Sequence, residues 1–275
     1  MVKREPFQAY APAFLQIEKW KAIAPNVTAG ISTRIGGVSP SPYHELNTGF
    51  HVNDREEHVI ENRERLAKTL DSSLSDWVNV YQVHGKNIVE VTEEDRGKGT
   101  RDPHTVLADA DGMYTKAAGV YLAAGFADCT PLFFVAPSHH LIGVAHAGWK
   151  GTVAQIGPEM VRIWHEKHGV PLNEIYAVIG PAIGKCCYEV DNRVMEQVRA
   201  LPFDKTNPPF IEKENGKAQL DLKQLNMQLL EHAGIPTANL ECSTYCTSCE
   251  SDKFFSHRRD NGKTGRMLGV ITQTE

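Results

Sequence analysis

Four short apolar runs lie close together near the middle of the chain and constrain the fold more than any other feature. They cover residues 112–115, 120–126, 132–135 and 141–145. Runs this short with few polar residues are typical of strands that are buried on both faces of a sheet. A chain of 275 residues can also bury a large core. We therefore predict a sheet-centred protein whose central strands are covered from both sides.

Segments with helical periodicity surround these runs. We predict helices from an N-cap at Asn53 or Asp54 through residue 70, at 149–168 with a bend or restart at Pro158, at 191–201 and at 221–233. Further strands are expected at 26–33, 77–83, 87–91, 174–179, 253–259 and 267–272, with 77–83 and 87–91 joined by a hairpin-like turn at His84. We expect residues 93–104 to form a flexible loop that could act as a lid, and residues 202–217 to form a proline- and charge-rich connection between two helices. This order predicts an α+β protein with mixed sheets, and the lack of a linker favours a single domain over residues 1–275.

Composition and charge exclude some classes of function. The net charge of -5 lacks the basic footprint of a nucleic-acid binder, so we expect no nucleic-acid partner. No stretch approaches the ~20 apolar residues of a membrane span. The basic first residues are not followed by the apolar core of a signal peptide. We therefore expect a cytoplasmic protein without membrane contacts. In that compartment, six cysteines favour metal binding, catalysis or burial over disulfides.

Three metal-ligand candidates stand where apolar runs end. His84, Cys129 and His146 each follow such a run, beside glycine or proline residues. One thiolate and two imidazoles can hold Zn²⁺ with a position left open, as in catalytic zinc sites. The same side chains also suit a cysteine-dependent hydrolase or deamidase, in which Cys129 pairs with His84 or His146 and Asp128 orients the histidine. Residue type alone does not separate these two hypotheses.

The other cysteines give a weaker metal signal. Cys242, Cys246 and Cys249 have the spacing of the iron–sulfur motif in radical SAM enzymes. The motif stands near the end of the chain, however, and no βα repeat follows it. We therefore interpret Cys242 and Cys246 as buried thiols, Cys249 as a neighbour of the site, and the adjacent cysteines at 186–187 as packing residues.

Arg34 is the leading candidate for an anion site. It opens the turn Thr33-Arg34-Ile35-Gly36-Gly37, where a guanidinium could bind phosphate through two donors and glycines would let backbone N–H groups approach. Asn47 and His51 follow closely in sequence, and the segment 256–266 adds basic residues, Arg258 among them. The alternative for Arg34 is a surface ion pair at a tight turn, and a surface strand end would explain the basic residues of 256–266 equally well.

Several blocks together resemble the YfiH-like family, also called the laccase-domain or polyphenol oxidase family. The three signature blocks are Gln82-Val83-His84-Gly85, Ala127-Asp128-Cys129-Thr130-Pro131 and Ala145-His146-Ala147-Gly148-Trp149-Lys150-Gly151. Further similar blocks lie at 33–39, 46–52, 180–184, 187–190, 255–260 and 264–266. The resemblance covers nearly the whole chain in order.

This resemblance implies an α+β fold with mixed β-sheets layered with helices in a four-layer sandwich, related to bacterial toxin deamidase domains. It implies a zinc ion held by His84, Cys129 and His146. It also implies a purine nucleoside phosphorylase that acts on adenosine, inosine, guanosine and methylthioadenosine with phosphate, has adenosine deaminase activity, and works as a monomer or homodimer. The older family name implies copper-dependent phenol oxidation.

The residues themselves argue against a multicopper oxidase. Such enzymes use many histidines, often in His-x-His pairs, and none of the twelve histidines here forms such a pair. One two-histidine, one-cysteine site would still bind Cu²⁺ adventitiously. For catalysis we expect Asp128 to carry the proton in deamination and Arg34 to hold phosphate in phosphorolysis. The expected substrate-binding residues are Arg34, Asn47, His51, Trp149 and Arg258.

Overall fold

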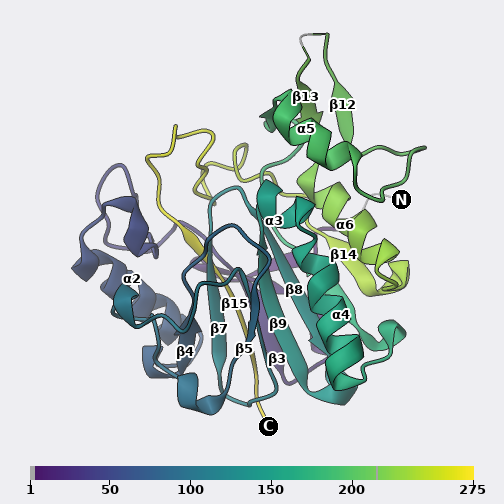
Figure 1. Ribbon diagram of the computed structural model, residues 1–275. Helices are drawn as coiled ribbons and strands as arrows, with labels where there is room; N and C mark the ends of the chain where they lie inside the picture. The colour runs from purple at the N-terminus through teal and green to yellow at the C-terminus, as the bar shows by residue number, and fades with distance from the viewer. Residues whose placement is uncertain (1–3, 215) are drawn as a thin grey trace.

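Two six-stranded sheets stacked face to face form the centre of the protein (Figure 1). The computed structural model describes residues 4–214 and 216–275. The first sheet has the order β1 (Phe7–Ala11), β2 (Phe14–Ile17), β3 (Val27–Ser32), β15 (Met267–Gln273), β7 (Tyr121–Phe126) and β4 (Trp77–Asn79). The second has the order β14 (Leu240–Cys242), β10 (Tyr176–Ile179), β8 (Thr130–Ala136), β9 (Leu141–Ala147), β6 (Gly112–Thr115) and β5 (Ile88–Glu90). A small third sheet contains β11 (Glu189–Val190), β13 (Ala218–Leu220) and β12 (Phe210–Glu212).

Helices cover the outer faces of both large sheets. The α-helices are α1 (Trp20–Ile23), α2 (Glu56–Thr69), α3 (Trp149–Val153), α4 (Ile156–His168), α5 (Asn192–Arg199) and α6 (Leu222–His232). Helix α2 packs on the first sheet, where Leu66 and Leu70 join the apolar cluster around Trp77. Helices α4 and α6 pack on the second sheet, where Trp164 and Leu230 join another cluster. The layers are therefore helix, sheet, sheet and helix, which confirms the predicted α+β fold with mixed, layered sheets.

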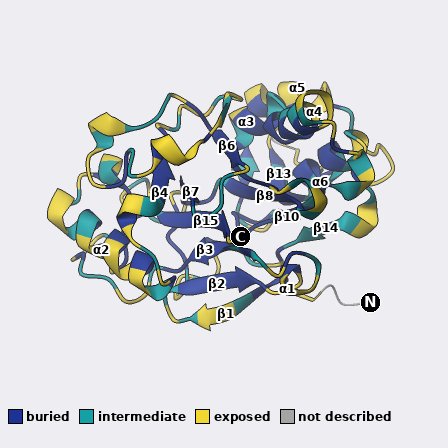
Figure 2. Ribbon diagram, turned by 90° about the horizontal axis from the view of Figure 1, so that it is seen from below, coloured by how far each residue is buried: buried dark blue, intermediate teal, exposed yellow. Residues whose placement is uncertain are grey.

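The central apolar runs are strands buried on both faces, as predicted. All seven residues of β8 and of β9 are buried. Along β8, Phe133 and Val135 pack between the two sheets, while Leu132 and Phe134 pack against the helix layer. This alternation follows from the two-residue period of a strand. Figure 2 shows these buried strands at the centre, with exposed residues on the outer helices and loops.

The predicted hairpin around His84 is wrong. Strand β4 pairs in parallel with β7 in the first sheet, whereas β5 pairs in parallel with β6 in the second. Residues 80–87 therefore cross from one sheet to the other. His84 lies in this crossing segment with a positive φ of 61°, in the left-handed region that residues other than glycine seldom occupy.

Other boundaries also differ from the prediction. Arg55, not Asn53 or Asp54, is the N-cap residue of α2, and its side chain makes no capping bond. The segment 149–168 is interrupted at Gln155, whose φ is 60°, while Pro158 lies in the first turn of α4, where proline is tolerated. Residues 253–259 form turns rather than a strand.

The polar segment 93–104 is anchored to α2. The guanidinium of Arg63 donates hydrogen bonds to the carbonyls of Gly99 and Thr100, at 2.9 and 2.8 Å. Two short 3₁₀ turns, Glu93–Asp95 and Pro103–Thr105, add local structure to this segment. The segment is therefore held at Gly99 and Thr100, and its flexibility stays a prediction. None of the helices within 4–214 and 216–275 has the length and apolar character needed to cross a bilayer.

Candidate active site

The three metal-ligand candidates meet where the chain passes between the two sheets. His84 lies in the segment that joins β4 to β5, Cys129 in the turn that joins β7 to β8, and His146 in β9. Pairing of β8 with β9 sets Pro131 opposite His146, which brings Cys129 beside that histidine. The ligand atoms of the three residues all lie within 4.8 Å of one another. Their residue types and arrangement fit the donor set of a metal site with an open position.

A buried aspartate, missed by the sequence analysis, orients two of these residues. Asp111 accepts a hydrogen bond from His146 Nδ1 at 2.9 Å and from the backbone N–H groups of His84 and Gly85 at 3.0 and 2.6 Å. Because Nδ1 of His146 is engaged, Nε2 is the ring nitrogen that remains for a ligand. Such a carboxylate–imidazole contact is typical of metal-binding histidines. The only signal for it in the sequence was a carboxylate directly before a buried strand.

The electrostatics of the group favour an ionised thiol. Burial alone would raise the pKa of Cys129, but the imidazoles of His146 and His84 outweigh this effect and lower that pKa below its ordinary value. Burial would likewise lower the pKa of His146, but Cys129 and Asp111 outweigh it and raise that pKa. The lowered pKa favours the thiolate form of Cys129, which is the form that binds a metal and the form that acts as a nucleophile.

Gly148 leaves room beside the three candidate ligands. A Cβ atom at this position would lie 2.8 Å from Cys129 Sγ and 3.6 Å from His84 Cδ2. Any larger residue would therefore displace the sulfur. The space kept free by this glycine and the donor chemistry around it fit a bound metal ion.

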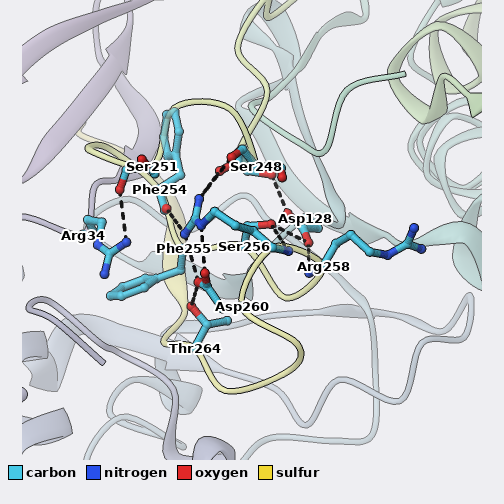
Figure 3. Close-up of polar contacts among 12 residues, drawn as sticks. Arg34, Asp128, Ser248, Ser251, Phe254, Phe255, Ser256, Arg258, Asp260 and Thr264 are labelled. Carbon is cyan, nitrogen blue, oxygen red and sulfur yellow. Dashed lines mark hydrogen bonds and ion pairs between the residues drawn. The ribbon is translucent and has the colours of Figure 1, made fainter. Parts of the chain in front are cut away.

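Asp128 is held by the C-terminal loop rather than free in the cavity. Its carboxylate accepts hydrogen bonds from Thr247 Oγ1 at 2.6 Å, from Ser256 Oγ at 3.0 Å and from the backbone N–H of Arg258 at 2.7 Å (Figure 3). With both oxygens occupied, it acts chiefly as a positioning residue that ties the Cys129 turn to this loop. These bonds leave little support for Asp128 as a proton carrier or as the orienting group of a histidine.

The structure does not bring Arg34 to the cavity. Its Nε donates to the carbonyl of His44 at 2.8 Å and its Nη1 to that of Ser251 at 3.1 Å. The guanidinium carbon lies 4.8 Å from the centre of the Phe255 ring, away from Asp128 and Arg258 (Figure 3). Arg34 therefore joins two loops through backbone carbonyls, and it is not among the residues that line the cavity.

Asn47 is also set back from the cavity, where it supports another arginine. Its side chain is fully buried. Its Oδ1 accepts a hydrogen bond from the backbone N–H of Arg266 at 2.9 Å, and its Nδ2 donates to Asp54 at 2.9 Å. Asn47 thus fixes the start of the last strand, where Arg266 faces the cavity.

The candidate ligands open into a cavity of about 960 Å³. His51, Trp149 and Arg258, three of the expected substrate residues, line it together with Asp128. Three further cations line the cavity: Arg63 and Lys150, for which the sequence predicted no substrate role, and Arg266, which was noted only among the basic residues of segment 256–266. Their signal is weak in the sequence because they lie far apart, on α2, on α3 and before β15.

The two arginines among these three cations differ in how many of their donors remain for a ligand. Arg63 is buried, and it is committed to the carbonyls of Thr48, Gly99 and Thr100. Arg266 uses only Nη1, which donates to the carbonyls of Thr264 and Gly265 at 3.0 Å. Within the described part of the chain, its Nε and Nη2 have no hydrogen-bond partner. Arg266 can therefore donate to a ligand in the cavity.

His51 stands at the cavity rim close to these cations. Enclosure by the cavity lowers the pKa of His51 to about 4, and the positive charges of Arg266 and Arg63 act in the same direction. The imidazole is therefore neutral at pH 7 and can donate or accept a hydrogen bond. A concave site with apolar walls and several converging polar groups is typical of small-molecule binding.

Comparisons with known proteins match nearly the whole chain. A family described as multi-copper polyphenol oxidoreductase laccase matches residues 28–274. The protein named purine nucleoside phosphorylase YlmD, from Bacillus subtilis, is 48% identical over 275 residues, which cover 98% of each chain. The crystal structure of the hypothetical protein YfiH from Bacillus licheniformis has a TM-score of 0.95 at 47% identity, covering 98% of this chain and 100% of that one. A Neisseria meningitidis protein has a TM-score of 0.79 at 31% identity, covering 98% of this chain and 100% of that one. The chain therefore belongs to the YfiH or laccase-like family, whose members include proteins named purine nucleoside phosphorylase.

Proposed function

We propose that this protein is a zinc-dependent purine nucleoside phosphorylase acting on adenosine, inosine, guanosine and methylthioadenosine, with adenosine deaminase activity in the same cavity. The observation that carries the proposal is one cavity that is lined by three metal-ligand candidates and by several cationic side chains. The names of its relatives support the same class of reaction. We also propose that the chain acts as a single domain, because this cavity draws residues from Thr48 to Leu268.

We propose Arg266 as the phosphate-binding residue in place of Arg34. Arg266 lines the cavity, and within residues 4–214 and 216–275 its Nε and Nη2 have no hydrogen-bond partner. A guanidinium binds phosphate oxygens through two parallel hydrogen bonds. Lys150, exposed at the rim, adds positive charge. In phosphorolysis the protein must hold phosphate against the sugar carbon while the bond to the purine breaks. Arg266 would supply both the position and the charge for this step.

We propose that the purine contacts Trp149 and Tyr188, which line the same cavity. The guanidinium carbon of Arg258 lies 5.1 Å from the centre of the Tyr188 ring. Arg258 is held there by a hydrogen bond from its Nη1 to the carbonyl of Glu189 at 2.8 Å. Aromatic faces bind flat bases with little dependence on their substituents, which fits a set of several purine nucleosides.

His84, Cys129 and His146 would hold the zinc ion, and Asp111 would keep two of them in position. Zinc at such a site supplies Lewis-acid chemistry that polarises a bound oxygen or nitrogen. Gly148 keeps the space for it. A copper ion could occupy the same donors. Within residues 4–214 and 216–275, however, this is the only group of close ligands that contains histidine, so the residues suit one ion better than the copper cluster of the family name.

A cysteine-dependent hydrolase is the second candidate, and one observation favours it. Cys129, His146 and Asp111 follow one another in hydrogen-bonding order, and His146 Nδ1 lies 2.9 Å from Asp111. This order is that of a nucleophile, a base and an orienting carboxylate. Asp111 thus replaces Asp128 in the hypothesis drawn from the sequence.

Two assays separate these candidates. The purified protein is incubated with adenosine, with and without phosphate, and adenine, ribose 1-phosphate and inosine are measured. We expect phosphate-dependent adenine release, which His84→Ala and a strong chelator both abolish. Activity that survives metal removal but is lost after iodoacetamide treatment would favour the cysteine hydrolase. Lys116→Ala, a surface change away from the cavity lining, serves as the matched control.

A further inference from the structure

Four cysteines form a second cluster that is separate from the candidate active site. The sulfurs of Cys186, Cys187, Cys246 and Cys249 all lie within 4.8 Å of one another. The interpretation of the first pair as packing residues holds for Cys187, which packs against an apolar cluster, but not for Cys186, which is exposed. The arrangement also separates Cys242 from the three-cysteine motif, because Cys242 is not one of the four.

Strand topology brings these cysteines together across 60 residues of sequence. Strands β10 and β14 pair in parallel, so the segments that follow them leave the same edge of the sheet. The two segments stay side by side, since the backbone N–H of Ser243 donates to Ile179 at 2.8 Å and that of Thr247 donates to Ala182 at 3.1 Å. The cysteine pair of each segment therefore faces the other.

Two of the distances between sulfurs are close to those of a tetrahedral thiolate site. Cys249 Sγ lies 3.6 Å from Cys186 Sγ and 3.5 Å from Cys187 Sγ. Zn–S bonds of ~2.3 Å in a tetrahedron place neighbouring sulfurs about 3.8 Å apart. A shared ion would bring the sulfur of Cys249 close to both of the others. A disulfide would join it to only one of them.

The backbone around the cluster has features of a built site. The N–H of Gly184 donates to Cys246 Sγ at 3.2 Å, which stabilises a thiolate. A Cβ atom on Gly184 would lie 3.2 Å from Cys186 Sγ and 3.3 Å from Cys246 Sγ, so a larger residue would crowd the sulfurs. Cys246 and Cys249 have the x₂ spacing of zinc-binding turns, and the N–H of Cys249 donates to the carbonyl of Cys246 at 3.1 Å.

A positive charge lies beside the same turn. The guanidinium of Arg259 donates to the carbonyls of Thr247 and Ser248, at 3.0 and 3.4 Å. Both carbonyls belong to the stretch between Cys246 and Cys249. Because Arg259 is also paired with Asp260 at 2.8 Å, it holds this turn in shape and supplies no free charge to the cluster.

We propose that Cys186, Cys187, Cys246 and Cys249 form a closed structural zinc site. Each thiol would give up its proton as its bond to zinc forms, and no position would remain for substrate. The site would fasten the segment that carries Tyr188 to the segment that carries Thr247, whose hydroxyl donates to Asp128. It would thereby hold two parts of the cavity wall without taking part in the chemistry.

Zinc content and coordination test this proposal. The full chain is purified under reducing conditions without added metal, and zinc is measured by mass spectrometry. The zinc that remains in His84→Ala protein is then studied by X-ray absorption. We expect one zinc equivalent per chain in that variant, with only sulfur neighbours at about 2.3 Å. The double variant Cys186→Ser/Cys249→Ser, which changes two exposed cysteines, should lose this zinc ion. The single variant Cys242→Ser should keep it.

The outcomes separate this site from the proposed active site. Nitrogen neighbours in His84→Ala protein, or no bound zinc there, would overturn the proposal. So would four freely alkylated thiols, a disulfide within the cluster, or iron in place of zinc. If the double serine variant does not fold, the His84→Ala measurement still decides the question. A failed phosphorylase assay would leave an all-sulfur zinc signal intact, so the two proposals fail independently.

Discussion

Replacing Asp111 by asparagine tests the candidate centre without changing any of its three proposed ligands. Oδ1 of the carboxylate accepts from His146 Nδ1 and the backbone N–H of His84, while Oδ2 accepts from the backbone N–H groups of Val83 and Gly85. An amide keeps one acceptor and turns an NH₂ group toward the other two donors. The variant therefore loses two hydrogen bonds to a charged acceptor. The NH₂ group of the asparagine also faces two N–H groups, with no acceptor between them.

The structure sets the expected size of the effect. Each lost bond to a charged group costs about 1–3 kcal/mol, and the lower half of that range applies because water can reach residues 83–85. We expect the free energy of unfolding of the metal-free protein to fall by about 2–4 kcal/mol. Metal affinity should fall by roughly 10–100-fold, the usual effect of removing a carboxylate that orients a histidine ligand.

Two measurements check this expectation. Urea unfolding of chelator-treated protein gives the stability term, and competition with a chromophoric chelator gives the affinity, with His84→Ala protein supplying the background from the cysteine cluster. Asp109→Asn, an exposed carboxylate two residues earlier, is the matched control and should change stability by less than about 0.5 kcal/mol. If Asp111→Asn behaves like this control in both assays, the role assigned to Asp111 is wrong.

Three further perturbations address the cavity. Gly148→Ala would place a Cβ atom 2.8 Å from Cys129 Sγ, so metal affinity should fall about tenfold or more. Unchanged affinity in chelator competition would show that Gly148 is not needed to leave room beside the ligands. Arg266→Ala should raise the KM for phosphate by roughly 10–100-fold, as expected for a lost charged hydrogen bond, whereas Arg34→Ala should leave that KM unchanged and lower the Tm; equal KM effects in initial-rate assays would count against Arg266. The pKa of His51 is about 4 in the folded protein against 6.5 ordinarily, so the unfolded chain binds an extra proton between these pH values and stability should rise with pH across that window. Urea unfolding should show a shallower slope there for His51→Gln, and an unaltered slope would reject the assignment.

Much of the centre could be predicted because it depends on local patterns. Apolar runs identified the buried strands. Residues that directly follow such a strand must lie at the edge of the sheet where the strand ends. The expectation that His84, Cys129 and His146 lie together rested on this reasoning and on the family resemblance. The three side chains do meet, although their binding of zinc stays a prediction.

The rest depends on pairings that no local pattern encodes. Two short strands around His84 fit a hairpin and a crossing between sheets equally well, because the partner strands lie elsewhere in the sequence. Arg34 looked like an anion site since a glycine turn follows it, yet its donors are used by carbonyls of distant loops. Asp111 carried no spacing signal, and the cysteine pairs at 186–187 and 246–249 became one cluster only through the parallel pairing of β10 with β14.

The position of the candidate centre between the sheets gives it a mechanical consequence. Cys129 follows a strand of the first sheet, while His146 belongs to the second and His84 to a segment that crosses between them. An ion bound by all three would therefore cross-link the two sheets, since separating the sheets would require breaking a bond to the ion. By linkage, an ion that binds only the closed sandwich lowers the equilibrium constant for opening by a factor of one plus the ratio of the free ion concentration to Kd. Amide hydrogen exchange in β7 and β9 should report the occupancy of this site even when no substrate is present.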